Sequence, residues 1–120
     1  MSGKFTEVHQ RSLDNPEEFW AEAAQLIDWY KKWDRVFDDN DAPFCEWFPG
    51  GELNTCFNAL DRHVEAGNGD RTALIYDSPI TGNKGSFTYS ELLKKVSCFA
   101  GVLRANGVDK GDRVIIYMPM

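Results

Sequence analysis

The chain has 120 residues, of which 42% are hydrophobic, 13% aromatic and 27% charged, with a formal net charge of −6 and a pI of about 4.8. This balance is typical of a soluble globular domain, or of part of one, and excludes a disordered or low-complexity segment. An acidic surface repels phosphate backbones and anionic lipids, so we expect no nucleic acid and no membrane among the partners.

The cysteines and histidines give no metal-binding pattern. Cys45, Cys56 and Cys98 are widely and irregularly spaced, and neither His9 nor His63 lies near a cysteine pair. We therefore expect no zinc site, and thiols in a reducing compartment. No apolar run approaches the ~20 residues of a membrane span, and the first residues resemble neither a signal peptide nor an arginine-rich leader. We expect a cytoplasmic protein.

A first helix is predicted from Asn15 to about Asp28. Asn15 can cap it, Pro16 suits the first helical position, and Glu18 completes a pair that resembles a capping box. An apolar stripe then recurs at helical spacing: Phe19, Trp20, Ala23, Ala24 and Ile27.

An irregular aromatic arm is predicted from Trp29 to Gly51. It is rich in Asp, Pro and Gly, yet it contains seven aromatic residues: Trp29, Tyr30, Trp33, Phe37, Phe44, Trp47 and Phe48. Because large rings are costly to leave in water, we expect the arm to lie against another surface. An aromatic cage for a ligand is the functional alternative.

The second half predicts an alternation of helices and extended segments. A helix is expected from Thr55 to about Ala66 and is ended by Gly67. Ala73–Tyr76 and Ser86–Thr88 are expected to form a β-hairpin around a loop from Asp77 to Gly85. Thr88 and Glu91 form a capping box before a third helix, which Asn106 and Gly107 end.

The last predicted element is a strand from Arg113 to Met118. It follows a tight turn, Val108–Asp112, and is an unbroken apolar run after its first residue. Such a run after a helix is typical of a parallel strand that is covered on both faces. The residues therefore predict α/β architecture.

One loop has the composition of a phosphate-binding site. Ser78–Gly85 contains hydroxyls, glycines and a lysine, but Asn83 separates Gly82 from Lys84, and a strand follows instead of a helix. A phosphate loop needs Gly-Lys directly before a helix whose N–H groups face the phosphate. We interpret this segment as a hairpin loop.

The acidic pairs do not indicate a catalytic site. Glu17 and Glu18 would point in different directions from a helix, and Asp38 and Asp39, with Asp41 close behind, lie in a loop. No local signature of a nucleophile or a dinucleotide fingerprint is present. The residues alone therefore reveal no activity.

Several segments resemble the acetyl- and propionyl-CoA synthetases, which are AMP-forming acyl-CoA synthetases of the adenylate-forming superfamily. They occur in the family's order and cover nearly the whole chain: Asn15–Trp20, Ile27–Trp29, Leu53, Asn58–His63, Gly69–Pro79, Phe87–Leu92 and Gly107–Met120. Two stretches, Trp29–Trp33 and Tyr76–Thr81, resemble the propionyl-CoA branch more than the acetyl branch.

The resemblance implies an incomplete fold. Residues 1–60 would be the N-terminal cap segment of short-chain members, with a helix and the aromatic arm. Residues 61–120 would begin the AMP-binding adenylation domain with its first hairpin, helix and parallel-type strand. The family activates a carboxylate with Mg-ATP to an acyl-adenylate and then transfers the acyl group to coenzyme A.

The groups that bind ATP, magnesium, coenzyme A and the acyl chain lie beyond position 120 in the family. The resemblance therefore implies no catalytic, cofactor-binding or metal-binding residue in this chain. We expect an N-terminal fragment of a short-chain acid–CoA ligase for propionate or acetate, inactive alone. Its partner would be the rest of the adenylation domain.

A stand-alone interaction module derived from the same fold is the alternative. It would form a homodimer through the exposed strand or the aromatic arm.

Overall fold

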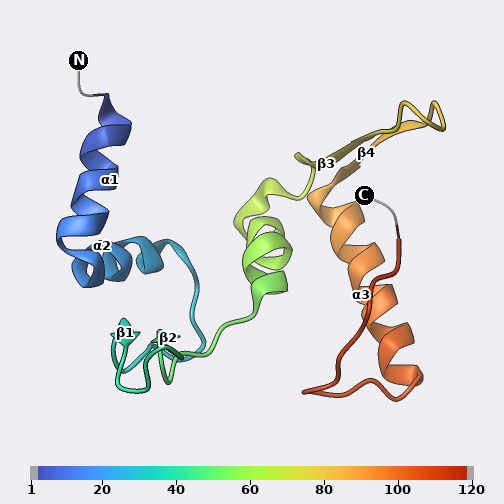
Figure 1. The fold of residues 1–120 in the computed structure, drawn as a ribbon. Coiled ribbons are helices and arrows are strands. Elements are labelled where there is room, and N and C mark those ends of the chain that lie inside the picture. Colours follow the sequence, from blue (N-terminus) through green and yellow to red (C-terminus); the bar gives the residue numbers. More distant parts are fainter. Residues whose placement is uncertain (1–2, 119–120) are drawn as a thin grey trace. The chain divides into compact units, whose positions relative to one another are not determined.

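The computed structural model describes residues 3–118, and its contacts divide the chain into two compact units (Figure 1). The first unit spans residues 1–58 and the second spans residues 59–120. Helices and antiparallel strand pairs occur in both units, which confirms the predicted α/β class.

The first unit begins with two helices that meet at Asn15. Helix α1 (Lys4–Asp14) was not predicted; α2 (Pro16–Ala23) and a 3-10 turn, η1 (Ala24–Leu26), form the predicted first helix. The Asn15 N–H donates to the Arg11 carbonyl oxygen at 3.1 Å, and its side-chain amide donates to Glu18 at 2.6 Å. Asn15 therefore ends one helix and holds the start of the next.

The aromatic arm of the first unit is folded rather than irregular. Strands β1 (Phe37–Asp38) and β2 (Glu46–Trp47) pair antiparallel, and Lys31 and Glu52 form a further antiparallel bridge. The surface against which the arm was predicted to lie is therefore formed largely by the arm itself.

A helix from residue 55 to residue 68 confirms the second predicted helix. It contains two stretches of π-helical hydrogen bonding, η2 (Phe57–Asp61) and η3 (Val64–Asn68). Gly67 adopts a φ of 80°, which an L side chain rarely tolerates, so the predicted stop lies where a glycine is needed.

The second unit contains the predicted hairpin and third helix. Strands β3 (Thr72–Asp77) and β4 (Lys84–Thr88) pair antiparallel, and α3 (Tyr89–Ala105) follows at once. The capping box is present: the Glu91 N–H donates to Thr88 Oγ1 at 3.2 Å, and the Thr88 N–H donates to Glu91 Oε2 at 2.9 Å.

The predicted parallel-type strand at Arg113–Met118, called the apolar segment from here on, requires a correction. The structure forms no strand there, and among the described residues none donates or accepts a backbone hydrogen bond with it. A strand exists only as part of a ladder. The only long strands described, β3 and β4, pair with each other instead.

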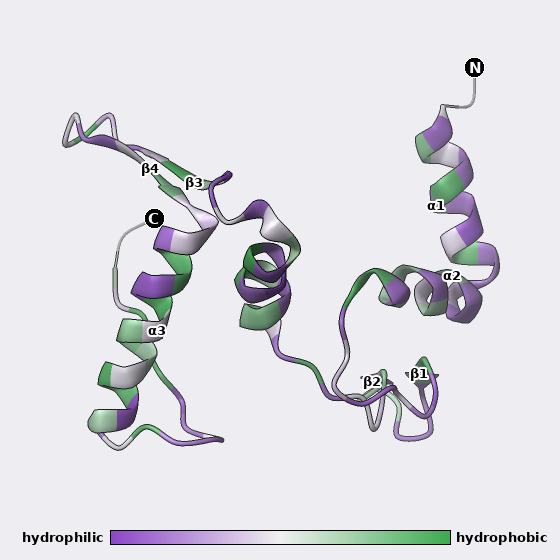
Figure 2. Ribbon diagram, turned by 180° about the vertical axis from the view of Figure 1, so that it is seen from behind, coloured by the Kyte–Doolittle hydropathy of each residue, from purple (hydrophilic) through white to green (hydrophobic). Residues whose placement is uncertain are grey.

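The described residues bury few side chains. Ala24, Val36 and Leu60 are the buried apolar residues of residues 3–118, and only Leu60 belongs to the second unit. Figure 2 shows apolar colouring along α3 and on the hairpin strands. The second unit therefore has local secondary structure without a complete hydrophobic core.

Candidate functional site

The hairpin loop uses its polar groups to fold itself. The Ser78 N–H donates to the Asn83 carbonyl at 2.9 Å, and the Gly82 N–H donates to the Ser78 carbonyl at 2.8 Å. Lys84 forms an ion pair with Asp77 across the hairpin at 2.8 Å. The amides and the lysine that a phosphate would need are thus engaged in the loop, which confirms the hairpin interpretation.

The acidic residues hold local structure. Asp38 pairs with Arg35 at 3.1 Å and accepts the Asn40 N–H at 3.1 Å, while Glu18 accepts from Asn15. Within residues 3–118, no three His, Cys, Asp or Glu side chains lie close enough together to hold a metal ion. The structure brings none of the acidic pairs together around a shared space.

The histidines and cysteines are also dispersed. His63 is half-buried, with its ring 4.9 Å from that of Tyr89, and His9 stacks on Phe5 at 5.8 Å. All three cysteines are exposed. His63 therefore packs on Tyr89, the first residue of α3.

The aromatic arm contains a self-packed cluster. The ring centroids of Trp29 and Trp33 lie 4.9 Å apart, those of Trp29 and Phe48 5.4 Å, and those of Trp33 and Phe48 5.1 Å, in edge-on or tilted geometry. The Trp29 Nε1–H donates to the Ala24 carbonyl oxygen at 2.9 Å. Each ring faces another ring, so these contacts favour packing over a ligand cage.

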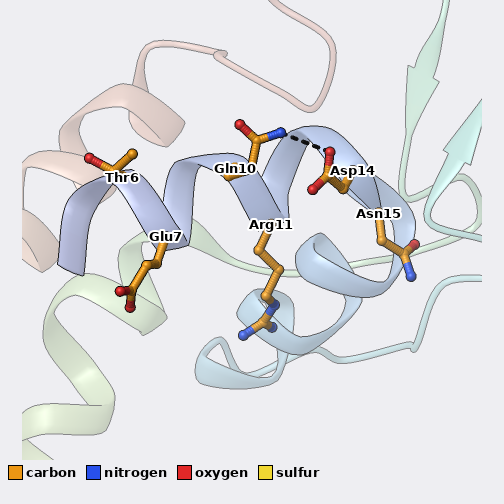
Figure 3. Close-up of a pocket in the computed structure, with 6 residues that line it drawn as sticks. All are labelled: Thr6, Glu7, Gln10, Arg11, Asp14 and Asn15. Carbon is orange, nitrogen blue, oxygen red and sulfur yellow. Dashed lines mark hydrogen bonds between the residues drawn. The ribbon is translucent and has the colours of Figure 1, made fainter. Parts of the chain in front are cut away.

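A shallow hollow on α1 is lined by polar residues that the sequence did not single out (Figure 3). Thr6, Gln10 and Asp14 point to one side of the helix, and Glu7 and Arg11 point to the other. Gln10 donates to Asp14 at 2.8 Å, and Arg11 forms an ion pair with Glu22 of α2. The Arg11–Glu22 ion pair joins α1 to α2 at this corner, and the groups that line the hollow do not converge on a ligand.

The described part of the chain therefore presents no convergent catalytic geometry. The prediction that residues 1–120 contain no catalytic, cofactor-binding or metal-binding residue stays a prediction. Sequence reasoning missed the α1 corner because its partner residues lie on two helices and their pairing depends on the angle between them.

Two family models match the chain, one after the other. Residues 5–59 match the acetyl-coenzyme A synthetase N-terminus, and residues 60–120 match the AMP-binding enzyme family. The fold agrees, since the structure resembles the acetoacetyl-CoA synthetase from Streptomyces lividans with a TM-score of 0.75 and 32% sequence identity. That similarity covers 94% of this chain and 17% of the other.

The curated relatives are synthetases of the same kind. The human mitochondrial acyl-CoA synthetase short-chain family member 3 is 52% identical over 109 residues, which are 91% of this chain and 16% of the relative. The chloroplastic/glyoxysomal acetyl-coenzyme A synthetase of Arabidopsis thaliana is 46% identical over 123 aligned residues, covering 98% of this chain and 17% of the relative. The chain thus spans about a sixth of the length of these relatives.

These matches define the class as the N-terminal region of an AMP-forming acyl-CoA synthetase. The chain belongs to the AMP-binding enzyme family, in the group that contains the acetyl- and short-chain acyl-CoA synthetases. The relatives do not distinguish a propionyl-CoA branch. In residues 3–118, no helix has the length and apolar character needed to cross a bilayer.

Proposed function

We propose that this chain is the N-terminal part of a short-chain acid–CoA ligase that converts propionate or acetate, ATP and coenzyme A to acyl-CoA, AMP and pyrophosphate. The observation that carries the proposal is the unbroken order of two synthetase family matches over residues 5–120. ATP, magnesium and coenzyme A would be bound by the complete enzyme, outside this chain.

In this proposal, residues 1–60 are the cap segment and residues 61–120 begin the adenylation domain. The matches at 5–59 and 60–120 support such a division. The preference for propionate is supported by the resemblance of Trp29–Trp33 and Tyr76–Thr81 to the propionyl branch. A cytoplasmic location stays a prediction, which fractionation of the source cells would test.

The test uses the protein expressed from its complete reading frame. It is incubated with Mg-ATP, coenzyme A and acetate, propionate or butyrate in turn, and acyl-CoA and AMP are measured by chromatography. We expect kcat/KM to be highest for propionate. A preference for acetate would remove the propionate assignment, and no product from any acid would remove the ligase assignment.

The same assay on the 120-residue chain tests whether it is inactive alone. We expect no acyl-CoA above the level without protein, because the described residues contain no convergent site. Product from this chain alone would contradict the proposal.

A second candidate is a stand-alone interaction module. It is favoured by the exposure of apolar side chains on both units, for example Phe44 at 79% and Ile115 at 86%. Light scattering after size exclusion separates the two candidates. A discrete oligomer that protects these residues would favour the module, and a monomer would count against it.

A further inference from the structure

Two asparagines of the chain are followed directly by glycine. They are Asn68 and Asn106, and each of the other five asparagines precedes a residue that has a side chain. An asparagine loses its amide when the backbone nitrogen of the next residue attacks its side-chain carbonyl carbon. Because glycine has no Cβ, its nitrogen is the least shielded and its backbone the most mobile for this attack. The two Asn–Gly pairs are therefore the candidate sites of spontaneous deamidation.

The first pair, Asn68 and Gly69, is held by contacts with a distant element. Both residues are half-buried. The Gly69 carbonyl accepts the Ser90 N–H at 3.0 Å, and the nearby Arg71 carbonyl accepts the Tyr89 N–H at 3.0 Å. A Cβ at Gly69 would lie 2.4 Å from Ser90 Oγ, so the two backbones approach closely here. The backbone of this pair can rearrange only if its turn separates from the start of α3.

The second pair, Asn106 and Gly107, closes the last turn of α3 and is exposed. The Gly107 N–H donates to the Arg104 carbonyl at 3.0 Å, and the side-chain Nδ2 of Asn106 donates to the Val102 carbonyl at 2.8 Å. Both acceptors lie within four residues of their donors. The contacts that hold this pair therefore belong to the helix end itself.

Helix ends open more readily than contacts between separate elements. Fraying of a terminal turn has a free energy near zero, whereas packed junctions open at a cost closer to that of global unfolding. Fraying frees the Gly107 nitrogen and the Asn106 amide together and lets them approach each other. At Asn68, the two hydrogen bonds to the start of α3 must also break, which makes the reactive state at least about tenfold rarer.

We propose that Asn106 is a site of spontaneous deamidation in the folded protein and that the fold protects Asn68. The Gly107 nitrogen forms a bond to Asn106 Cγ, and its proton passes through solvent to the departing amide group, which leaves as ammonia. Water then opens the cyclic succinimide at either carbonyl, which gives aspartate or isoaspartate at position 106. Water is the only co-reactant, and no oxidation or reduction takes place.

Either product changes the end of α3. The donor to the Val102 carbonyl is lost, and a carboxylate takes its place at the C-terminal end of the helix, where the unpaired carbonyls already carry partial negative charge. Isoaspartate also adds a methylene group to the backbone before Gly107. We therefore expect the modified protein to open more readily over the last turn of α3.

The test follows both positions in the protein expressed from its complete reading frame, folded and in urea, at mildly alkaline pH. Mass spectrometry of peptides detects the gain in mass when an NH2 group is replaced by OH, and a protein-isoaspartate methyltransferase labels the isoaspartate. In the folded protein we expect position 106 to convert at least about tenfold faster than position 68. In urea the two rates should become similar, because glycine follows both asparagines.

Substitutions separate the site from its consequence. Asn106→Gln keeps an amide but would have to form a larger ring, so it should remove most of the isoaspartate formed in the folded protein. The matched control, Asn68→Gln, should leave that amount unchanged. Asn106→Asp reproduces one product and should speed hydrogen exchange over residues 103–108 by about twofold to fivefold.

Three results would overturn the proposal. One is conversion at position 68 as fast as at position 106 in the folded protein. Another is a difference between the two positions that persists in urea, because the fold would then not be its cause. The third is conversion at position 106 no faster than at the asparagines that precede other residues. None of these readouts depends on ligase activity, so a protein that makes no acyl-CoA leaves this inference standing.

Discussion

The side-chain amide of Asn58 joins Asp28, the residue before the aromatic arm, to the helix at residues 55–68. Its Oδ1 accepts the Asp28 N–H at 2.8 Å, and its Nδ2 donates to the Asp28 carbonyl at 2.9 Å and to the Asn54 carbonyl at 3.0 Å. The two hydrogen bonds between the Asn58 amide and the Asp28 backbone resemble a pair of hydrogen bonds between β-strands. Asn58→Ala removes all three bonds while leaving the helix propensity favourable.

The expected loss follows from the number and exposure of these bonds. A typical hydrogen bond contributes about 0.5–1.5 kcal/mol net, and exposed ones lie at the low end because water replaces the lost partner. We therefore expect Asn58→Ala to lower the unfolding free energy of the first unit by about 1.5 kcal/mol. The Asn58→Asp variant should be no more stable than Asn58→Ala. It retains the acceptor for the Asp28 N–H but turns an oxygen towards the carbonyl oxygens of Asp28 and Asn54.

Tryptophan fluorescence during urea unfolding isolates the relevant unit. All four tryptophans of the chain (Trp20, Trp29, Trp33 and Trp47) lie in the first unit. The midpoint should fall while the slope with urea stays constant, as expected for a change in stability alone. The matched control is Asn40→Ala, an exposed asparagine of the same unit with no side-chain hydrogen bond among the described residues.

Two results would refute this reasoning. One is a midpoint for Asn58→Ala equal to that of Asn40→Ala, which would mean that the amide bonds contribute nothing. The other is an Asn58→Asp variant as stable as the parent chain, which would mean that the donor side of the amide is unimportant.

Three further predictions concern single contacts. Thr88→Ala should reduce the stability of α3 by about 1 kcal/mol, since it removes the cap that accepts the Glu91 N–H, and far-UV circular dichroism during unfolding would show it; an unchanged transition would contradict the capping role. Gly51→Ala would place a Cβ 2.7 Å from Trp29 Cζ3. It should therefore lower the unfolding free energy by about 1–3 kcal/mol and shift the tryptophan emission. A variant with unchanged stability and emission would contradict the close packing. Gly101→Ala meets no atom within 4 Å inside α3 and should raise helix stability by about 0.5–1 kcal/mol; a loss on thermal unfolding would refute an open helix face.

Local signals in the sequence predicted much of the second unit. The capping box of Thr88 and Glu91 and the stops at Gly67 and Gly107 depend on residues within a few positions of one another. Their geometry follows from backbone conformation: Gly67 and Gly107 have φ values of 80° and 82°. The hairpin was predicted for the same reason, because its loop closes on itself.

Non-local features were not predicted. Helix α1 begins after Gly3, which offers no side-chain cap, and its apolar residues Phe5, Val8 and Leu13 are 80%, 45% and 62% exposed, so neither a cap nor burial marks it. The short strands β1 and β2 exist only because the arm folds back, and residue spacing does not encode that contact.

The apolar segment shows the opposite case. Its sequence predicts a strand, but the structure forms none there, because a strand cannot form without neighbouring strands. The described residues form no convergent site, and the resemblance implies that the family's catalytic groups lie outside these 120 residues, which stays a prediction.

The local contacts of the second unit bear on the order in which the polypeptide is synthesised. At roughly 5–20 residues per second, a ribosome takes about 6–24 seconds to make 120 residues, and hairpins and helices form within microseconds of emerging. β3, β4 and α3 can therefore fold on the nascent chain, whereas Val114–Met118 forms no strand with the described residues. The exposed apolar side chains of Val114–Met118 would make this segment a target for chaperones that bind nascent chains.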